Sequence, residues 1–306
     1  MRVAVVDIGT NSTRLLLADV AAGRVTERER HTTITRLGQG VDRNGALAPE
    51  AMERVFAAVA RYRAIVDDAG GADRTIGVLT SAVRDASNGA AFAAAVRDRY
   101  GVDARTIPGE EEARLTFLGA TSKRDGDGAT LVVIDIGGGS TEFVVGRGRE
   151  VSFFASTQAG VVRMSERHLA HDPPRAGERR ALAADARAVY AASLPAAIRD
   201  GVVEAIAVAG TATSLAAIDQ DLEPYDPERV HGHRLDRATI DAIGARLAAL
   251  PEAERRRVRG LHPDRAPTIV AGALLLGEAL DAFGLASTEV SEHDILRGAA
   301  IAAAAR

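Results

Sequence analysis

The chain repeats one short pattern twice, and this repeat constrains its fold more than any other feature. The segment VAVVDIGTNSTRLLLADV begins at Val3, and LVVIDIGGGSTEFVVG begins at Leu131. Aligning Asp7 with Asp135 matches Ile-Gly and Ser-Thr in both copies. Each copy is an apolar β-branched run, a tight turn of small polar residues and a second apolar run, and a third β-like stretch follows. With 306 residues the chain is long enough for two domains. The repeat therefore predicts two halves that each open with a strand, a tight turn and two more strands.

Both turns combine glycine with hydroxyl or amide side chains, a composition that suits an anion site. Glycine has no Cβ, so backbone N–H groups near it can approach an anion closely. An acid at the end of the first strand is placed to reach a metal ion or its water ligands. Ordinary hairpins also use Gly, Asn and Ser, so one such turn alone indicates little. Two matching turns favour an anion site.

A third glycine segment follows the apolar stretch Ala205–Ala209. It reads Gly-Thr-Ala-Thr-Ser from Gly210 and leads into a helical pattern. A strand, a small-residue turn and a helix N-terminus make an anion site, because unpaired N–H groups and the helix dipole point outward. Ordinary helix capping by Thr and Ser explains the same residues equally well.

Composition excludes several classes of protein. The chain has no cysteine, so disulfides, thiolate nucleophiles and zinc–thiolate sites are excluded. No apolar run approaches the roughly 18 to 20 residues of a membrane span. The N-terminal MRVAVVDIG reads as a strand rather than a signal peptide, so we expect a cytoplasmic enzyme without a membrane partner. The net charge is −4 without a basic tail, which argues against nucleic-acid binding.

Seven motifs occur in the order found in the exopolyphosphatase and guanosine pentaphosphatase family. They are DIGTNSTRLL, TSAVRDASN, PGEEEARLTFLGA, DIGGGSTEF, VAGTATSLAAI, GLHPDRAPTIVAGALLL and SEHDILRGAA. Together they extend from Asp7 to Ala300, so the chain resembles this family over essentially its whole length. The sequence stops where longer members add helical domains, and it therefore resembles the short two-domain form.

The resemblance implies an α/β fold of two ribonuclease-H-like domains around a central cleft. Actin, sugar kinases and heat-shock chaperone ATPases share this fold. The last helix is expected to return to the first domain, so domain I comprises residues 1–121 and 290–306 and domain II residues 122–289. The polar segment TSKRDGDGA, Thr121–Ala129, is the expected boundary. The family and the Ala-rich terminal helices also indicate a homodimer.

Hydrolysis of a phosphoanhydride needs an oriented water, and three adjacent glutamates are candidates to orient it. Glu110, Glu111 and Glu112 follow Pro-Gly at the start of a predicted helix. Acids in a first helical turn interact favourably with the dipole, so capping alone accounts for them. By the resemblance, Glu112 matches the family's catalytic glutamate, the general base for the attacking water. Glu111 is the neighbour most easily confused with it.

The resemblance also implies a metal site. Asp135 and Glu142 in DIGGGSTE match the family's metal ligands, and Asp7 is a less certain third member. Magnesium prefers a few carboxylates together with water and phosphate oxygens, so the expected cofactor is Mg²⁺, with Mn²⁺ as an alternative. From the residues alone, Asp7 and Asp135 are equally typical of turn caps.

The predicted phosphate ligands are turn residues and three arginines. Arg14 occupies the position that Glu142 has in the second copy, so one turn attracts phosphate where the other holds metal. Arg84 and Arg265 match arginines that the family uses around the substrate, although each is also typical of a structural salt bridge. The full predicted set is Gly9, Thr10, Asn11, Ser12, Arg14, Arg84, Gly137, Gly138, Gly139, Ser140, Thr141, Gly210, Thr211 and Arg265.

The expected function is that of an exopolyphosphatase, which removes terminal phosphate from inorganic polyphosphate. Without accessory domains to extend a channel, short chains are the expected substrate. The alternative is a guanosine pentaphosphate 5′-phosphohydrolase, which needs the same catalytic set; nothing in the sequence identifies a guanosine pocket. A polyphosphate:ADP phosphotransferase is less favoured, because a glutamate base is directed at water. A non-catalytic polyphosphate or alarmone sensor is also less favoured, because a binder needs no base.

Overall fold

The computed structural model describes residues 1–124 and 128–305, which form two compact units. Unit 1 contains residues 1–122 and the C-terminal segment from His293, and unit 2 extends from Lys123 to Glu292. The domain boundaries expected from the sequence fall after residues 121 and 289, within a few residues of the boundaries of these units. Of the expected boundary segment Thr121–Ala129, residues 125–127 lie outside the described part of the chain. No helix among the described residues is long and apolar enough to cross a lipid bilayer.

Unit 1 is built on a five-stranded sheet that begins with the first copy of the repeat. Its strands are β1 (Arg2–Ile8), β2 (Ser12–Ala21), β3 (Arg24–Ile34), β4 (Arg74–Leu79) and β5 (Asp103–Thr106). The first three strands pair antiparallel, and β4 and β5 continue parallel to β1. The order is therefore β3-β2-β1-β4-β5.

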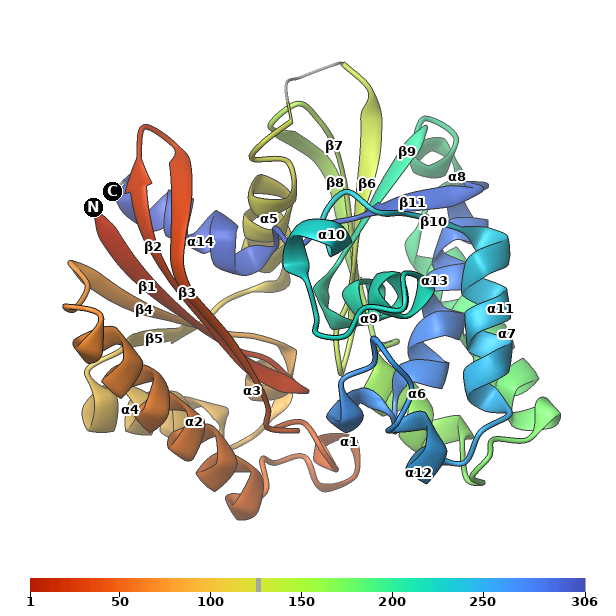
Figure 1. The fold of residues 1–306 in the computed structure, drawn as a ribbon, viewed down its shortest axis with the longest axis horizontal. Coiled ribbons are helices and arrows are strands. Elements are labelled where there is room, and N and C mark those ends of the chain that lie inside the picture. The colour runs from red at the N-terminus through yellow and green to blue at the C-terminus, as the bar shows by residue number, and fades with distance from the viewer. Residues whose placement is uncertain (125–127, 306) are drawn as a thin grey trace. The chain divides into compact units, whose positions relative to one another are not determined.

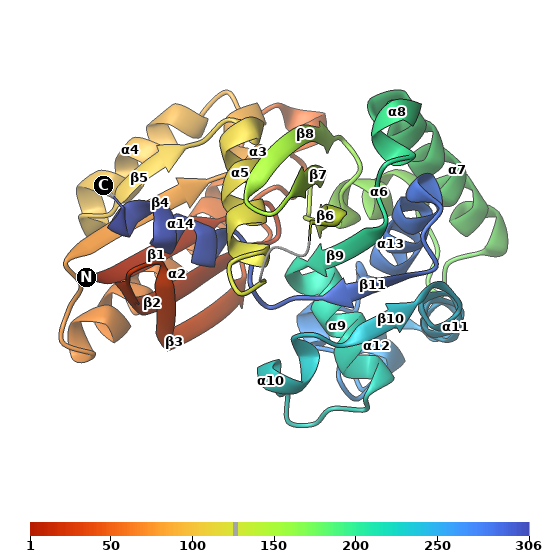
Figure 2. The same ribbon diagram turned by 90° about the horizontal axis from the view of Figure 1, so that it is seen from above.

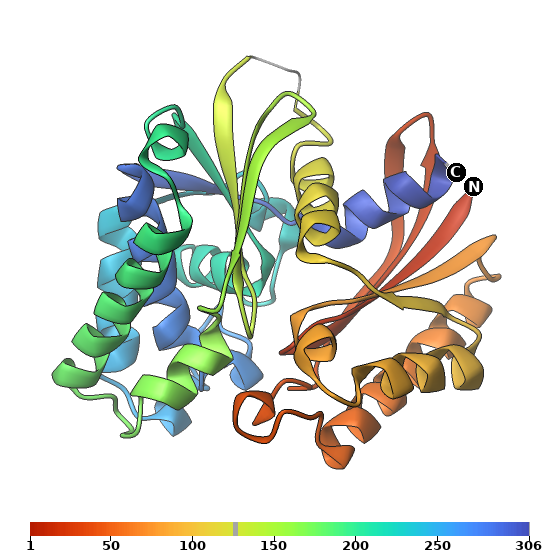
Figure 3. The same ribbon diagram turned by 180° about the vertical axis from the view of Figure 1, so that it is seen from behind.

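Alternating side chains of β1 supply two cores, one on each face of this sheet. Val3 and Val5 pack with α5 (Gly109–Ala120) and α14 (Ile295–Ala304), whereas Ala4 and Val6 pack under α2 (Pro49–Asp68) and α4 (Gly89–Tyr100). Figures 1 and 3 show these helix pairs on opposite faces of the sheet. The short helices α1 (Val41–Asn44) and α3 (Ser81–Asp85) lie in the connections.

Unit 2 repeats the same arrangement with one strand added. Its strands are β6 (Thr130–Ile136), β7 (Thr141–Arg147), β8 (Glu150–Thr157), β9 (Glu204–Val208), β10 (Arg234–Asp236) and β11 (Ser287–Val290). The sheet order β10-β11-β9-β6-β7-β8 contains β8-β7-β6-β9-β11, which matches unit 1 strand for strand, and β10 joins antiparallel at the edge. The predicted duplication and the two ribonuclease-H-like domains are confirmed.

Helices account for most of the rest of unit 2. They are α6 (Val161–His168), α7 (Ala176–Ser193), α8 (Ala196–Arg199), α9 (Ala209–Asp219), α10 (Pro227–Val230), α11 (Arg237–Ala248), α12 (Glu252–Arg255), the 3₁₀ turn η1 (Pro263–Arg265) and α13 (Ile269–Phe283). The apolar α13 is buried along most of its length and packs against α7 and α11. Sheet and helices thus share one core.

The C-terminal helix α14 packs on the sheet of unit 1, beside α5 (Figure 2). Two glycines allow this approach. A Cβ built on Gly119 would lie 1.9 Å from the carbonyl oxygen of Asp294, and one built on Gly298 would lie 1.8 Å from that of Leu115. The backbones of the two helices are therefore in direct contact, and no larger residue fits at either position.

We predict that Gly119→Ala lowers the stability of the protein by about 1 to 3 kcal/mol, because the methyl group forces α5 and α14 apart. Gly177→Ala is the matched control, since a Cβ on this helical glycine meets nothing within 4 Å. Urea denaturation followed by circular dichroism measures both variants. Equal midpoints for Gly119→Ala and the wild type would contradict the close helix contact.

Candidate phosphate-binding and catalytic site

The two repeated turns have the same backbone hydrogen bond. The amide of Gly9 donates to the carbonyl of Ser12 at 2.9 Å, and the amide of Gly137 donates to that of Ser140 at 3.0 Å. Each bond closes a tight loop between the first two strands of its unit. The sequence repeat is thus also a repeat of turn geometry.

In unit 2, the segment after β8 holds the carbonyl groups of this turn. The amides of Val161 and Val162 donate to the carbonyls of Gly137 and Gly138, at 2.9 and 2.8 Å. The side-chain Nε of Arg163 donates to the carbonyl of Gly139 at 2.8 Å. Three successive carbonyls therefore accept hydrogen bonds from the first turn of α6.

Fixing the carbonyls also fixes the amides. The peptides of this turn are trans, so each N–H points opposite to the carbonyl of the same peptide. The amides of Gly138, Gly139 and Ser140 therefore point away from the start of α6, whose donors bind the carbonyls of the same peptides. Within residues 128–305 the structure gives these three amides no acceptor. Successive N–H groups turned to one side form an anion-binding nest.

Unit 1 uses a loop in place of a helix for the same purpose. The amide of Gly38 donates to the carbonyl of Thr10 at 2.8 Å, and the amides of Thr35 and Arg36 donate to that of Asn11. By the same geometry, the amides of Asn11 and Ser12 face away from residues 35–38. The hydroxyl groups of Thr10 and Ser81 lie 2.8 Å apart and are both buried.

The third glycine segment differs from the sequence-based expectation. The strand ends at Val208 and helix α9 already begins at Ala209, so Gly210 to Ser214 lie inside the helix rather than in a turn before it. Ala209 takes a φ of 63°, in the left-handed region that non-glycine residues seldom adopt. This sharp strand-to-helix change leaves no room for a separate turn.

Gly210 and Arg265, which were predicted separately as phosphate ligands, are in contact. A Cβ built on Gly210 would lie 1.4 Å from an Nη of Arg265. The guanidinium thus packs directly on the backbone at the start of α9. Helix N-terminus and arginine side chain together concentrate positive potential there. Thr211 is buried beside them.

The three adjacent glutamates of α5 have different surroundings. Glu110 is exposed, and Glu111 forms an ion pair with Arg105 at 2.8 Å. Glu112 is buried, and its Oε2 accepts a hydrogen bond from Arg84 at 3.1 Å. The same Nη1 of Arg84 donates to the carbonyl of Ile107. Arg84 thus fixes the Glu112 carboxylate, and only this glutamate has the burial expected of a catalytic base.

Strands β1, β4 and β5 run parallel, so the segments that follow them lie at the same edge of the unit 1 sheet. Their carboxyl ends lead to Gly9, to Thr80 and Ser81, and to Ile107 just before α5. Ligands of open α/β sheets bind beyond the carboxyl ends of the strands. Thr80 and Ser81, both buried, were missed from the sequence, although TSAVRDASN follows a predicted strand and could have indicated them.

The residues at the hairpin ends show how the two copies diverged. Asp7 pairs with Arg14 across β1 and β2, as Asp135 pairs with Glu142 across β6 and β7. In unit 1 the pair is a partly buried salt bridge, with Nε of Arg14 at 2.8 Å from the buried carboxylate of Asp7. Burial raises the pKa of Asp7, and the charge of Arg14 opposes that rise. The guanidinium of Arg14 also forms an ion pair with the carboxylate of Asp294.

In unit 2 the corresponding pair consists of two acids. Glu142 is buried, and its Oε1 accepts a hydrogen bond from Ser156 at 2.8 Å. Like charges at directly opposite strand positions repel, and a bound cation would relieve that repulsion. Two carboxylates with water and phosphate oxygens match the ligands Mg²⁺ prefers, so this pair fits a metal. The described residues contain no group of three metal-binding side chains. In unit 1 the carboxylate of Asp7 is held by Arg14.

Comparison with known proteins agrees with this architecture. The model of the Ppx/GppA phosphatase family matches residues 16–299. Exopolyphosphatase 2 of Mycobacterium tuberculosis is 38% identical, over 99% of this chain and 98% of that protein. The chain belongs to the Ppx/GppA phosphatase family.

Solved structures of Ppx/GppA proteins have the same fold. A crystal structure of an exopolyphosphatase-like protein superimposes with a TM-score of 0.92 at 34% identity, over 99% of this chain and 97% of that one. The Aquifex aeolicus family member gives a TM-score of 0.82 at 29% identity, over 100% and 98% of the two chains. As a Ppx/GppA phosphatase, the protein is a hydrolase of phosphate bonds.

We predict that Gly160→Ala lowers the rate of phosphate release by about tenfold or more, since displaced amides lose their aim at the substrate. A Cβ there would lie 2.4 Å from Gly138 O and Ser140 N, so the turn must move. Gly201→Ala, whose Cβ meets nothing within 4 Å, is the control. Steady-state phosphate release measures both; full activity in Gly160→Ala would show that the amide nest is dispensable.

Proposed function

We propose that the protein is an exopolyphosphatase that hydrolyses the terminal phosphate of short inorganic polyphosphate. The observation that carries this proposal is the buried Glu112, held by Arg84 at the carboxyl ends of β1, β4 and β5. The names of two relatives support it: Exopolyphosphatase 2 of Mycobacterium tuberculosis, and an exopolyphosphatase of Cytophaga hutchinsonii with a TM-score of 0.87.

Glu112 acts as the general base in this proposal. Its carboxylate accepts a proton from a water molecule while the water oxygen forms a bond to the terminal phosphorus. The bond between that phosphorus and the bridging oxygen breaks, and the electron pair leaves with the shortened chain. Orthophosphate and a polyphosphate one unit shorter are the products. Arg84 holds the carboxylate of this base in a fixed orientation.

The turns and arginines stabilise the charge of the substrate. The amides of Gly138, Gly139 and Ser140 donate to phosphate oxygens, as do those of Asn11 and Ser12. Arg14, Arg84 and Arg265 supply positive charge, and a guanidinium suits a phosphate because both are forked groups. Fixed donors of this kind need no reorganisation as charge develops on the leaving oxygen.

Asp135 and Glu142 would hold Mg²⁺, or Mn²⁺ in its place. Such an ion, when bound, neutralises phosphate charge and orients the substrate. The hydrogen bond from Ser156 helps to orient the Glu142 carboxylate for a ligand. Asp7 stays a predicted ligand only, since its carboxylate already has the countercharge of Arg14.

Guanosine pentaphosphate is the alternative substrate, and the same residues would hydrolyse its terminal 5′ phosphate. The described residues show no feature that indicates a guanosine-binding pocket. The cytoplasmic location and the homodimer stay predictions.

We predict that wild-type protein with magnesium releases orthophosphate from short polyphosphate at a higher kcat/KM than from long polyphosphate or guanosine pentaphosphate. Glu112→Gln should lower this rate by about 10³-fold, in line with the loss of a general base and its orienting effect. Glu111→Gln is the matched control, because it changes the neighbouring carboxylate, which pairs with Arg105.

Several outcomes would count against the proposal. Release mainly from the nucleotide would favour the guanosine pentaphosphatase. Faster cleavage of long chains would contradict the length preference. Substrate binding without release by the wild type would indicate a sensor, and an active Glu112→Gln variant would remove Glu112 as the base.

We also predict that Glu142→Gln raises the magnesium concentration needed for half-maximal activity by about tenfold or more, since a ligand carboxylate is lost. Glu150→Gln, an exposed change at the start of β8 in the same hairpin, should leave that concentration unchanged. Activity titrated with magnesium after chelation measures both. Identical titration curves for Glu142→Gln and the wild type would exclude this residue as a ligand.

A further inference from the structure

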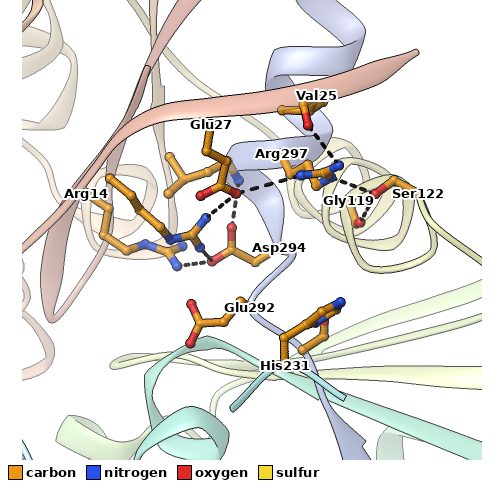
Figure 4. A network of polar contacts seen from close by, with 12 residues as sticks. Arg14, Val25, Glu27, Gly119, Ser122, His231, Glu292, Asp294 and Arg297 are labelled. Atoms are coloured by element: carbon orange, nitrogen blue, oxygen red, sulfur yellow. Dashed lines mark hydrogen bonds and ion pairs between the residues drawn. The ribbon is translucent and has the colours of Figure 1, made fainter. Parts of the chain in front are cut away.

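Asp294 is a buried carboxylate that the catalytic scheme does not use. It lies at the start of α14 in unit 1, and its side chain is 3% exposed. Figure 4 shows it among charged side chains that include Arg14, Glu27 and Arg297. Burying a charge is costly unless the charge is paired and hydrogen-bonded.

The two oxygens of Asp294 have separate partners. Oδ1 accepts from the amide of Leu296 at 3.1 Å and so caps the N-terminus of α14. Oδ2 contacts Nη1 of Arg14 and lies 3.5 Å from Nη2 of Arg30. The helix cap fixes where the carboxylate sits, and the other oxygen is presented to the arginines.

Arg14 is held at two edges of its planar guanidinium. Asp7 accepts a hydrogen bond from Nε at 2.8 Å and forms an ion pair with Nη2 at 2.7 Å, while Asp294 contacts Nη1 on the other side. One contact would leave the group free to turn about that edge. Two contacts on opposite edges fix its plane and hence the directions of its remaining N–H bonds.

We infer that Asp294 is a positioning residue that orients the Arg14 guanidinium for phosphate binding. This inference rests on the proposed function, in which Arg14 is a phosphate ligand. Burial opposes the charge on Asp294, but Arg14 and Arg30 outweigh it and lower its pKa, so the carboxylate stays ionised at neutral pH. The two residues are 280 positions apart in the sequence, and only the fold brings them into contact.

Asp294→Asn separates positioning from helix capping. Asparagine caps helices as well as aspartate does, so the Oδ1 bond to Leu296 can persist. Its NH₂ group replaces Oδ2, however, and a donor then faces the donors of Arg14. We expect kcat/KM for short polyphosphate to fall by about 10- to 100-fold, the loss that small misplacement of a binding group causes.

Arg297→Gln is the matched control on the same helix. Arg297 is buried, donates to Ser122 at 2.8 Å and to the carbonyl of Val25, and forms an ion pair with Glu27 at 3.7 Å. The variant should lower the thermal midpoint while keeping kcat/KM within about twofold of the wild type. If Asp294→Asn does not fold, Asp294→Ser tests the same point, since serine also caps a helix but has no carboxylate.

A double-mutant cycle with Arg14→Gln gives the decisive readout. If Asp294 acts through Arg14, the double variant is no less active than Arg14→Gln alone. An active Asp294→Asn protein beside an inactive Arg14→Gln protein would overturn the inference and leave the proposed function standing. Full activity of Arg14→Gln would instead remove Arg14 from the proposed function. Equal losses in Asp294→Asn and Arg297→Gln, in step with their stability, would make the role merely structural.

Discussion

The orientation of a few peptide groups is the constraint on which this structure depends. In each unit the turn after the first strand has its carbonyls held by a later segment, residues 35–38 in one and the start of α6 in the other. In a trans peptide the N–H bond points opposite to the C=O bond, so fixing the carbonyl also fixes the direction of the amide. The sheet, helix and loop of each unit fix the peptide planes of its turn. Backbone geometry alone therefore produces an anion-binding surface, without any charged side chain.

Side chains make the two copies different. The same pair of strand positions holds Asp7 with Arg14 in unit 1 and Asp135 with Glu142 in unit 2. The first combination is an ion pair in which each charge is already compensated. The second is a pair of acids that gains from a cation. A duplicated fold has thus produced two chemically complementary turns through a single reversal of charge at one position.

Much of the fold could be predicted from the sequence, because its signals are local. The repeat of DIG turns predicted two halves that each open with a strand, a tight turn and two more strands, and both sheets have this opening. The start of α9 was misplaced, since the strain at Ala209 that replaces a turn has no mark in the sequence. Asp294 was missed for another reason: its partner Arg14 is distant in the chain, and only the folded structure brings the two residues together. The burial that separates Glu112 from Glu110 and Glu111 is likewise a tertiary property.

The central claim is that a buried glutamate directs water, and not another acceptor, at the terminal phosphorus. Hydrolysis of short polyphosphate in water enriched with heavy oxygen, with ADP present, tests this claim most directly. The account predicts one heavy oxygen atom in each orthophosphate released and no ATP. Formation of ATP, with orthophosphate free of the label, would show transfer to the nucleotide and contradict the account.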